Sequence, residues 1–268
     1  MKGGPGLKTY IMFGVKTFSN QLSYRSEVWL RLLGNFVAIL ILTEIWRAVL
    51  GNGEIEGIGV EQMITYSIIN TLLAALLLTG ISAKVDNSLK TGSIASELIK
   101  PLSYPLHLLS EGLGNSFYQL VFTSIPSLFI AWIFFGFLPP ASATHFLFFL
   151  IALILALGIS FLLGYLISLL AFWLMNHFAL NWMLGGFITI FSGSFLPLWF
   201  FPDSWVTITK MLPFLYLGYL PAAIYLGAVT VQEIGTFIIT GLAWTAVLTL
   251  LVCWLWNRAI KRLVVQGG

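Results

Sequence analysis

Long apolar runs are the feature of this chain that most constrains its fold. A helix needs about 20 residues to cross about 30 Å of hydrocarbon, because each residue advances it by about 1.5 Å. Runs of this length occur at Leu30–Leu50, Gln62–Ala83, Leu108–Phe137, Phe146–Leu174, Leu180–Trp199 and Ile234–Trp256. We therefore predict an all-α polytopic membrane protein with six transmembrane helices, in which residues 1–268 form a single transmembrane domain.

The composition agrees with a chain that lies mostly in lipid. Of its 268 residues, 59% are hydrophobic and only 9% are charged, and the mean hydropathy is +0.95. A soluble domain of this size does not bury so much apolar surface in one core, so a lipid bilayer must cover the rest. The net charge of +3 comes without a basic stripe interleaved with aromatic residues, and we therefore expect no nucleic-acid partner.

The positive charges predict which side of the membrane each loop faces, because Lys and Arg in short loops stay in the cytoplasm. They gather around the start of the first span, between the second and third spans, and after the sixth: Lys2, Lys8, Lys16, Arg25, Arg31; Lys84, Lys90, Lys100; Arg258, Lys261 and Arg262. The first outer loop instead carries Glu54, Glu56 and Glu61. We expect both termini, including a tail at residues 257–268, to lie in the cytoplasm, in a multi-pass protein of the cell membrane.

The amino-terminal residues 8–29 have the pattern of a helix that lies in the membrane interface. Apolar residues repeat on one side at helical spacing: Ile11, Val15, Phe18 and Leu22. Polar residues repeat on the other side: Lys16, Asn20, Ser23 and Glu27. Two interpretations stay open, a simple membrane anchor and an elbow helix that couples motion at the cytoplasmic surface to the first span.

The cationic segment at residues 84–107 joins the second span to the third and must face water. Because the rest of the chain is almost wholly apolar, this segment is where we expect a soluble partner to bind.

The segment at residues 196–227 is too apolar for a solvated loop, and prolines interrupt it at Pro197, Pro202, Pro213 and Pro221. Irregular backbone at membrane depth survives only inside protein or beside water. We therefore predict two short re-entrant helices that dip back from the outer side. Asp203 is expected to cap the first helix, which must end by Pro213, and Pro221 is expected to open the second. Thr230 and Glu233 have capping-box spacing at the start of the last span.

Three spans carry charges, a proline or a repeat of small residues. Glu44 and Arg47 are three residues apart in the first span and can form an ion pair on one helix face, or they can contact a substrate. Pro126 is expected to kink the third span. In the fourth span, small residues repeat every four positions and allow another helix to approach closely: Ser160, Gly164 and Ser168.

The chain lacks the residues of several kinds of machinery. It has no nucleotide-binding loop of the form GxxxxGK[ST], its three histidines are scattered, and Cys253 stands alone. We therefore expect no enzyme activity, no metal and no cofactor in this chain, so that another chain must supply the energy for any uphill transport. An ion- or proton-coupled secondary transporter, which ordinarily needs acids in mid-span, and a non-transporting assembly protein stay open as alternatives.

The chain contains, in order, TGSIASELIKPLSYPLH (Thr91–His107), LAFWLMN (Leu170–Asn176), SGSFLPLWFFPDSW (Ser192–Trp205), LPFLYLGYLPAAIYLG (Leu212–Gly227) and a final VVQGG. Together these stretches resemble type-2 ABC export permeases, and within them the viologen or multidrug exporter permeases. The resemblance implies a six-span permease of a bacterial inner or plasma membrane, with an elbow helix, a cytoplasmic coupling helix and re-entrant helices between spans five and six.

The resemblance also implies partners and site residues. Such permeases work in pairs, identical or related, with two separate ATPase subunits that bind ATP and magnesium and drive alternating access. The residues that match the ATPase-coupling pattern are Gly92, Ile94, Glu97, Leu98, Pro101 and Pro105. Here Gly92 can end the helix leaving span two, and Ile94 and Leu98 make a one-turn apolar face.

The resemblance further implies a translocation path between two permeases, along spans one, two and five. The residues expected near its outer end or gate are Glu44, Arg47, Trp199, Phe201 and Trp205. The aromatic side chains can offer ring faces to a cation, although aromatic belts are common at membrane interfaces. We expect the cargo to be a hydrophobic, cationic or lipid-like compound.

Overall fold

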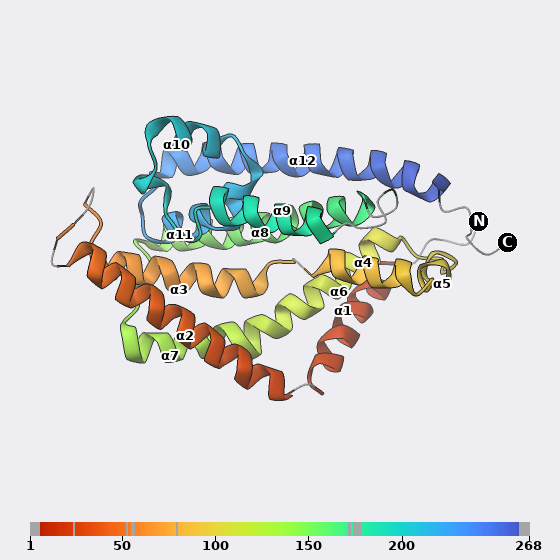
Figure 1. Cartoon of the computed structure of the whole chain (residues 1–268), viewed down its shortest axis with the longest axis horizontal. Coiled ribbons are helices and arrows are strands. Elements are labelled where there is room, and N and C mark those ends of the chain that lie inside the picture. Colours follow the sequence, from red (N-terminus) through yellow and green to blue (C-terminus); the bar gives the residue numbers. More distant parts are fainter. Residues whose placement is uncertain are drawn as a thin grey trace.

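The computed structural model describes residues 6–23, 25–51, 53–54, 57–78, 80–170, 173 and 178–262. Every regular element in these ranges is a helix, which confirms the all-α prediction. The helices α8 and α12 lie along the long axis of the molecule, and α1 and α2 run obliquely to them (Figure 1). The elements are α1 (Leu7–Gln21), α2 (Arg25–Leu50), α3 (Val60–Leu76), α4 (Ile81–Lys90), α5 (Ile94–Leu98), α6 (Tyr104–Gln119), η1 (Leu120–Ser124), α7 (Ile125–Phe135), α8 (Ala143–Leu170), α9 (Phe178–Phe191), η2 (Leu198–Phe200), α10 (Asp203–Lys210), η3 (Pro213–Leu217), α11 (Tyr219–Tyr225) and α12 (Val231–Arg262).

The described ranges contain five helical stretches that are long and apolar enough to cross a membrane, not the six that we predicted. The stretches are Ser26–Leu50, Val60–Lys90, Tyr104–Phe135, Ala143–Leu170 and Val231–Lys261. The predicted fifth span, Leu180–Trp199, is replaced by the 14-residue helix α9, which is about 21 Å long.

The helix α9 ends early because the chain turns back directly after it. Gly193 has φ +70°, a conformation that favours glycine, and a Cβ at this position would lie 2.8 Å from Cβ of Tyr219. The N–H of Tyr219 donates to the carbonyl oxygen of Ser192 over 2.6 Å. The chain therefore leaves the helix after Phe191, and Gly193 and Trp199 lie against Tyr219 of α11.

Two other spans differ from continuous helices. The second span, predicted as Gln62–Ala83, is interrupted after α3, where Leu77 is extended with φ −64° and ψ 142°. The third span passes through the π-helical turn η1 directly before Pro126, at the place where we predicted a kink. Proline lacks the N–H that an α-helical hydrogen bond needs, and a π-helical turn accommodates such a defect.

The two ends of the chain also have different bounds from those predicted. The first helix ends at Gln21, so the predicted interfacial segment 8–29 is divided between α1 and the start of α2. Residues 257–262 of the predicted tail are helical and continue α12, and residues 263–268 lie outside the described residues.

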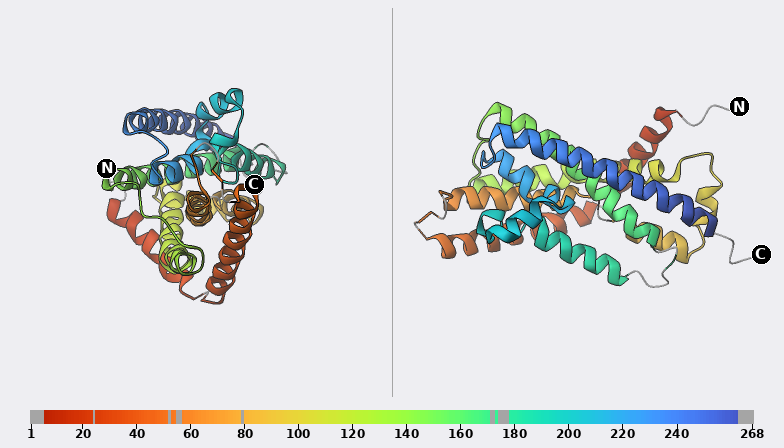
Figure 2. Two further views of the ribbon diagram at one scale, coloured as in Figure 1. Left: turned by 90° about the vertical axis from the view of Figure 1, so that its left-hand side faces the viewer. Right: turned by 90° about the horizontal axis from the view of Figure 1, so that it is seen from above.

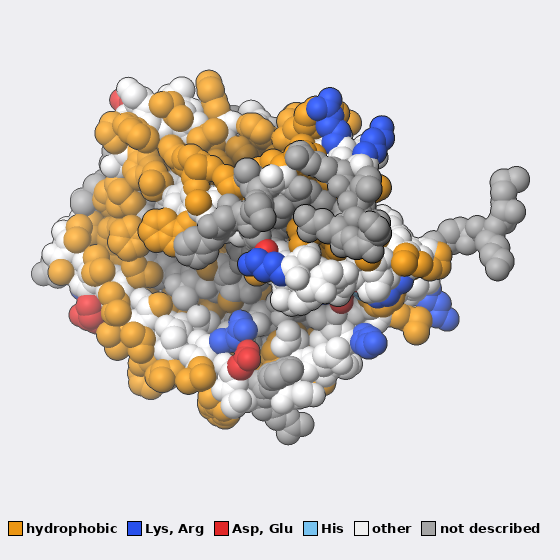
Figure 3. All heavy atoms as spheres, turned by 45° about the vertical axis from the view of Figure 1, so that its right-hand side comes forward, with side chains coloured by type: hydrophobic (Ala, Val, Ile, Leu, Met, Phe, Trp, Pro, Cys, Tyr) orange, Lys and Arg blue, Asp and Glu red, His pale blue; other side chains and the backbone are white. Residues whose placement is uncertain are grey.

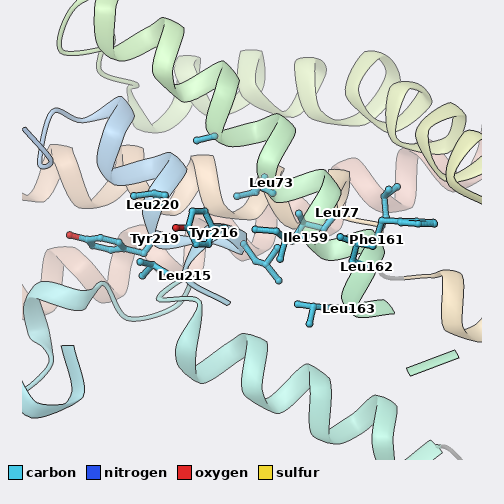
Figure 4. Packing of buried hydrophobic residues seen from close by; sticks show 14 of the residues in the cluster. Leu73, Leu77, Ile159, Phe161, Leu162, Leu163, Leu215, Tyr216, Tyr219 and Leu220 are labelled. Carbon is cyan, nitrogen blue, oxygen red and sulfur yellow. The ribbon is translucent and has the colours of Figure 1, made fainter. Parts of the chain in front are cut away.

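The helix α8 forms the centre of the core. It packs against α12, α11 and α4, and α12 follows it along the molecule (Figure 2). Leu215, Tyr216 and Leu220 from the segment after α9 meet Leu73 of α3 and Ile159 of α8 in this core (Figure 4). The small-residue stripe Ser160, Gly164 and Ser168 is buried, as expected for a close helix contact.

Candidate functional site

Basic side chains gather at the end of the molecule that carries α4, α5 and the last turns of α12 (Figure 3). The exposed cations on α4, directly after α5 and on α12 are Lys84, Lys90, Lys100, Arg258 and Lys261. We refer to this end as the basic end and to residues 91–103, which join α4 to α6 there, as the coupling segment.

The coupling segment begins and ends at residues that suit sharp turns. Gly92 has φ +69° and follows the last turn of α4, which confirms that it ends this helix. The one-turn helix α5 ends before Pro101, and Pro105 occupies the first turn of α6, where a missing N–H costs no helical hydrogen bond.

The apolar face of α5 points into the protein. Ile94 is only 3% exposed, and Leu98 is half-buried against the same core. Ile99, which directly follows the helix, is 83% exposed instead. Sequence reasoning missed Ile99. Its position directly after the apolar face of Ile94 and Leu98, and directly before Lys100, is a signal that its side chain faces away from the core.

Buried polar groups lie beneath the coupling segment. Glu97 interacts electrostatically with the hydroxyl of Tyr104, and both Glu97 Oε2 and Tyr104 Oη are buried. The ring of Tyr104 stacks on Trp256 of α12, with centroids 5.6 Å apart and planes at 12°. Trp256 also lies 6.1 Å from the ring of Tyr165 on α8. The coupling segment is thereby connected to both helices.

A charged cluster joins α4 to α6 and α1 nearby. Lys84 Nζ forms an ion pair with Glu111 Oε2, and His107 Nε2 lies 3.7 Å from the same oxygen. The ring of Phe13 packs edge-on against His107, with centroids 4.3 Å apart. His107 is one of the three scattered histidines of the sequence, and Glu111 four residues later is a local signal of a pair.

The helix α1 holds the far end of the coupling segment. The N–H of Ser103 donates to the hydroxyl of Tyr10 over 2.9 Å. Below this contact α1 crosses α6 at two glycines, because a Cβ on Gly114 would lie 2.9 Å from Cα of Gly14. The first helix is therefore in backbone contact with the helix that follows the coupling segment.

At the opposite end, Glu44 and Arg47 form the expected ion pair. Arg47 Nη1 donates to Glu44 Oε1 over 2.8 Å, and more than half of each side chain is exposed. Trp46 between them points into the core, where its Nε1–H donates to Ser67 Oγ over 2.9 Å and its ring stacks on Phe200 at 5.5 Å.

The aromatic residues predicted at the outer gate fall into two groups. Trp199 lies 5.3 Å from the ring of Tyr66 on α3 and 5.4 Å from that of Tyr219 on α11. Trp205 lies on α10, 48% exposed, and stacks on Phe191 of α9 at 6.1 Å. Phe201, which lies between Trp199 and Trp205 in the sequence, is half-buried.

Two neighbouring cavities open at this end. One of about 370 Å³ is lined by aromatic and polar side chains that include Trp199, Tyr219 and Gln62. The other, of about 470 Å³, shares Gln62 and adds the carboxylates of Glu54 and Glu61. Trp199 is the predicted gate residue that lines the first cavity, and neither cavity is lined by Glu44 or Arg47.

The residues 196–227 form short helices, with two corrections to the predicted caps. The cap position of α10 is Pro202, and Asp203 is its first helical residue without a side-chain cap. Pro221 is the third residue of α11, which opens at Tyr219. The helix α10 ends at Lys210, before Pro213 as predicted. The burial differs sharply, because α11 is wholly buried and α10 is mostly exposed.

The capping box at the start of α12 is confirmed. Glu233 Oε2 accepts hydrogen bonds from the N–H of Thr230 over 3.0 Å and from its hydroxyl over 2.8 Å, and the N–H of Glu233 donates back to Thr230 Oγ1 over 3.4 Å.

A comparison with protein families matches residues 32–267 to the family described as ABC-2 family transporter protein. No curated protein matches the chain. The family match covers nearly the whole chain, including most of α2, the coupling segment and the described part of α12.

Proposed function

Because the chain belongs to the ABC-2 family of transporter membrane proteins, we propose that it is the permease of an exporter driven by a separate ATPase. Proteins of this family are multi-pass, non-catalytic membrane subunits, and they generally pair with ABC ATPase subunits. In our proposal two such ATPase subunits bind ATP and magnesium and hydrolyse the ATP, and this chain moves the cargo.

The observation that carries the proposal is the exposure of Ile99 at the basic end. An isoleucine 83% exposed beside Lys100 and Pro101, directly after a one-turn helix fixed from below by Ile94, suits a contact with a soluble partner. Ile94 and Leu98 then anchor the coupling segment, while Ile99 and the exposed residues around it meet the ATPase. Gly92, Pro101 and Pro105 give the segment its shape, and Glu97 supports it from below.

The proposed orientation places the basic end and both termini in the cytoplasm of a bacterial cell, because the exposed cations gather there. In this orientation α1 is the elbow helix, α9 takes the place of the fifth of six spans, and α10 and α11 form the re-entrant pair on the outer side. A helix as short as α9 spans the bilayer only if neighbouring protein or local thinning covers the difference.

We propose that the path lies between two permease chains, identical or related, with Glu44 and Arg47 near its outer end. The viologen and multidrug permeases that the sequence resembles suggest a cationic or hydrophobic cargo. The outer cavities suit a cation, since one contributes aromatic rings and the other contributes Glu54 and Glu61.

The test is to purify the chain in mild detergent with the proteins that accompany it. We expect two permease chains and two ATPase subunits by mass measurement. The variant Ile99→Asp should lose the ATPase, while Met211→Asp, which places the same charge on a 68% exposed apolar residue of the opposite end, should keep it. Retention of a full complement of ATPase by Ile99→Asp contradicts the proposed contact, and a fully active complex with one permease contradicts the paired path.

A further inference from the structure

The second span is interrupted at Leu77, three residues before Gly80, which is the cap residue of α4. The helix α3 ends at Leu76, the backbone of Leu77 is extended, and α4 begins at Ile81. The residues on both sides of Leu77 are leucines, and this stretch contains no proline. A break leaves backbone groups without helical partners, which is costly away from water unless other groups replace them.

Side chains from two other helices supply the replacement hydrogen bonds. Ser116 of α6 donates its hydroxyl to the carbonyl oxygen of Leu76 over 2.6 Å. Ser160 of α8 accepts from the N–H of Leu78 over 3.2 Å, and it donates to the carbonyl oxygen of Leu157 on its own helix over 2.9 Å. Both serines are buried, so the break is held on each side by a hydroxyl in the protein interior.

The same two helices make room for Leu78. A Cβ on Gly112 of α6 would lie 3.1 Å from Cδ2 of Leu78, and a Cβ on Gly164 of α8 would lie 3.3 Å from its carbonyl oxygen. Leu77 is also buried, close to Ile159 and Leu162 of α8 (Figure 4). The interruption is therefore a packed feature with specific partners on both sides.

The break separates two parts of the span that have different neighbours. On one side α3 packs against α2, α7 and α11. On the other side α4 packs against α8 and leads through Gly92 to α5, whose Ile94 is buried in the same core. A displacement of the coupling segment therefore acts first on α4.

We propose that Leu77 is a pivot at which the coupling segment turns α4 relative to α3, and that Ser116 and Ser160 are positioning residues that hold this pivot. The inference rests on the proposed function, because the ATPase supplies the displacement. Bending a continuous helix breaks its own hydrogen bonds, whereas here hydroxyl groups already replace them and can rotate with the backbone. The stroke of the ATPase can then reorient α4 while α3 keeps its contacts with the outer aromatic residues.

The experiment measures distances between paired spin labels in the full permease–ATPase complex, in a Cys253→Ala background. One pair joins α4 to α8 through Asn87→Cys and Ile154→Cys, and the other joins α3 to α8 through Ala74→Cys and Ile154→Cys, all at exposed positions. Trapping with ATP and vanadate should shift the first distance by several ångströms and leave the second unchanged.

The role of Ser160 is tested with Ser160→Ala in the same labelled complex. Losing the acceptor for the N–H of Leu78 should broaden the α4 distance distribution before trapping and reduce its shift on trapping at least by half. The control Ser168→Ala removes a buried hydroxyl on the same helix that donates to Gly164 of its own helix, and it should leave both distances unchanged. Equal effects of the two substitutions contradict the positioning role of Ser160.

The outcomes separate the two proposals. ATP hydrolysis and ATPase content are measured in the same sample. A chain that never assembles with an ATPase overturns the proposed function and this inference with it. An assembled, hydrolysing complex in which both distances stay fixed, or in which both shift together, overturns the pivot alone.

Discussion

Ile94 and Ile99, five residues apart in the coupling segment, have opposite environments, since Ile94 is 3% exposed and Ile99 is 83% exposed. The one-turn helix between them directs one isoleucine into the core and leaves the other at the surface. A segment built this way is fixed to its own subunit and still presents an apolar side chain to a partner. The two residues therefore have separable roles that substitution can distinguish.

Truncation of the two isoleucines should affect different properties. Ile94→Ala removes buried methyl groups and should lower the free energy of unfolding by about 2–4 kcal/mol. Ile99→Ala should change that free energy by less than about 0.5 kcal/mol while weakening retention of the ATPase. Thermal unfolding in detergent and co-purification measure the two effects. An equal loss of stability in both variants would contradict the burial difference.

Substitution at Gly92 tests the turn that ends α4. A side chain at φ +69° costs about 1–2 kcal/mol, so Gly92→Ala should be destabilised by about that amount. The control Gly158→Ala adds a methyl group to α8 at a position with no neighbour within 4 Å in the described structure, and it should be neutral or stabilising. Comparing the thermal midpoints of the two variants checks the prediction.

The crossing of α1 and α6 depends on Gly114. A methyl group there collides with the backbone of Gly14, so Gly114→Ala should push α1 away at a cost of about 1–3 kcal/mol. Hydrogen exchange should then rise in residues 7–21 and stay unchanged in α12. The variant Gly185→Ala is the control, because that glycine has no neighbour within 4 Å among the described residues. Unchanged protection of α1 in Gly114→Ala would refute the close crossing.

The ion pair between Lys84 and Glu111 predicts a charge-reversal result. Lys84→Glu places two carboxylates together and should lower the thermal midpoint, by an amount that falls as salt is added. The effect should stay near 1 kcal/mol, because the Lys84 side chain is 44% exposed. The double variant Lys84→Glu/Glu111→Lys should recover most of the loss, and no recovery would mean that the pair contributes nothing.

Cysteine labelling distinguishes the exposure of positions along α10. Single cysteines replace each residue from Ser204 to Leu212 in turn, in the Cys253→Ala background. A membrane-impermeant reagent should rapidly label the cysteines that replace Thr207 and Met211. The cysteine that replaces Thr209 should react slowly, because Thr209 is fully buried. Uniform rapid labelling along the segment would rule out a packed helix.

Features that depend on neighbours in the sequence were predictable from the residues alone. The capping box of Thr230 and Glu233 and the ion pair of Glu44 and Arg47 each join residues three positions apart. The turn at Gly92 needs only the conformational freedom of one glycine. The apolar runs likewise predicted five of the span-length helices, because their length is a property of the sequence itself.

The remaining features required contacts between distant residues. Gly80 weakens the second span locally, but the packed break at Leu77 also depends on hydroxyls from Ser116 and Ser160, at separations of 40 and 82 residues from their partners. The early end of α9 likewise depends on Tyr219 packing over Gly193.

The sequence by itself determined that the chain is a helical membrane protein, where most of its helices lie, and at which end its cations gather. Only the tertiary structure decided where the second span is interrupted, which isoleucine of the coupling segment is buried, and which aromatic residues meet at the opposite end. The physical reason is that helix length, capping and charge act over a few residues. Replacing a lost backbone hydrogen bond or burying a side chain instead requires partners that folding brings together from other helices.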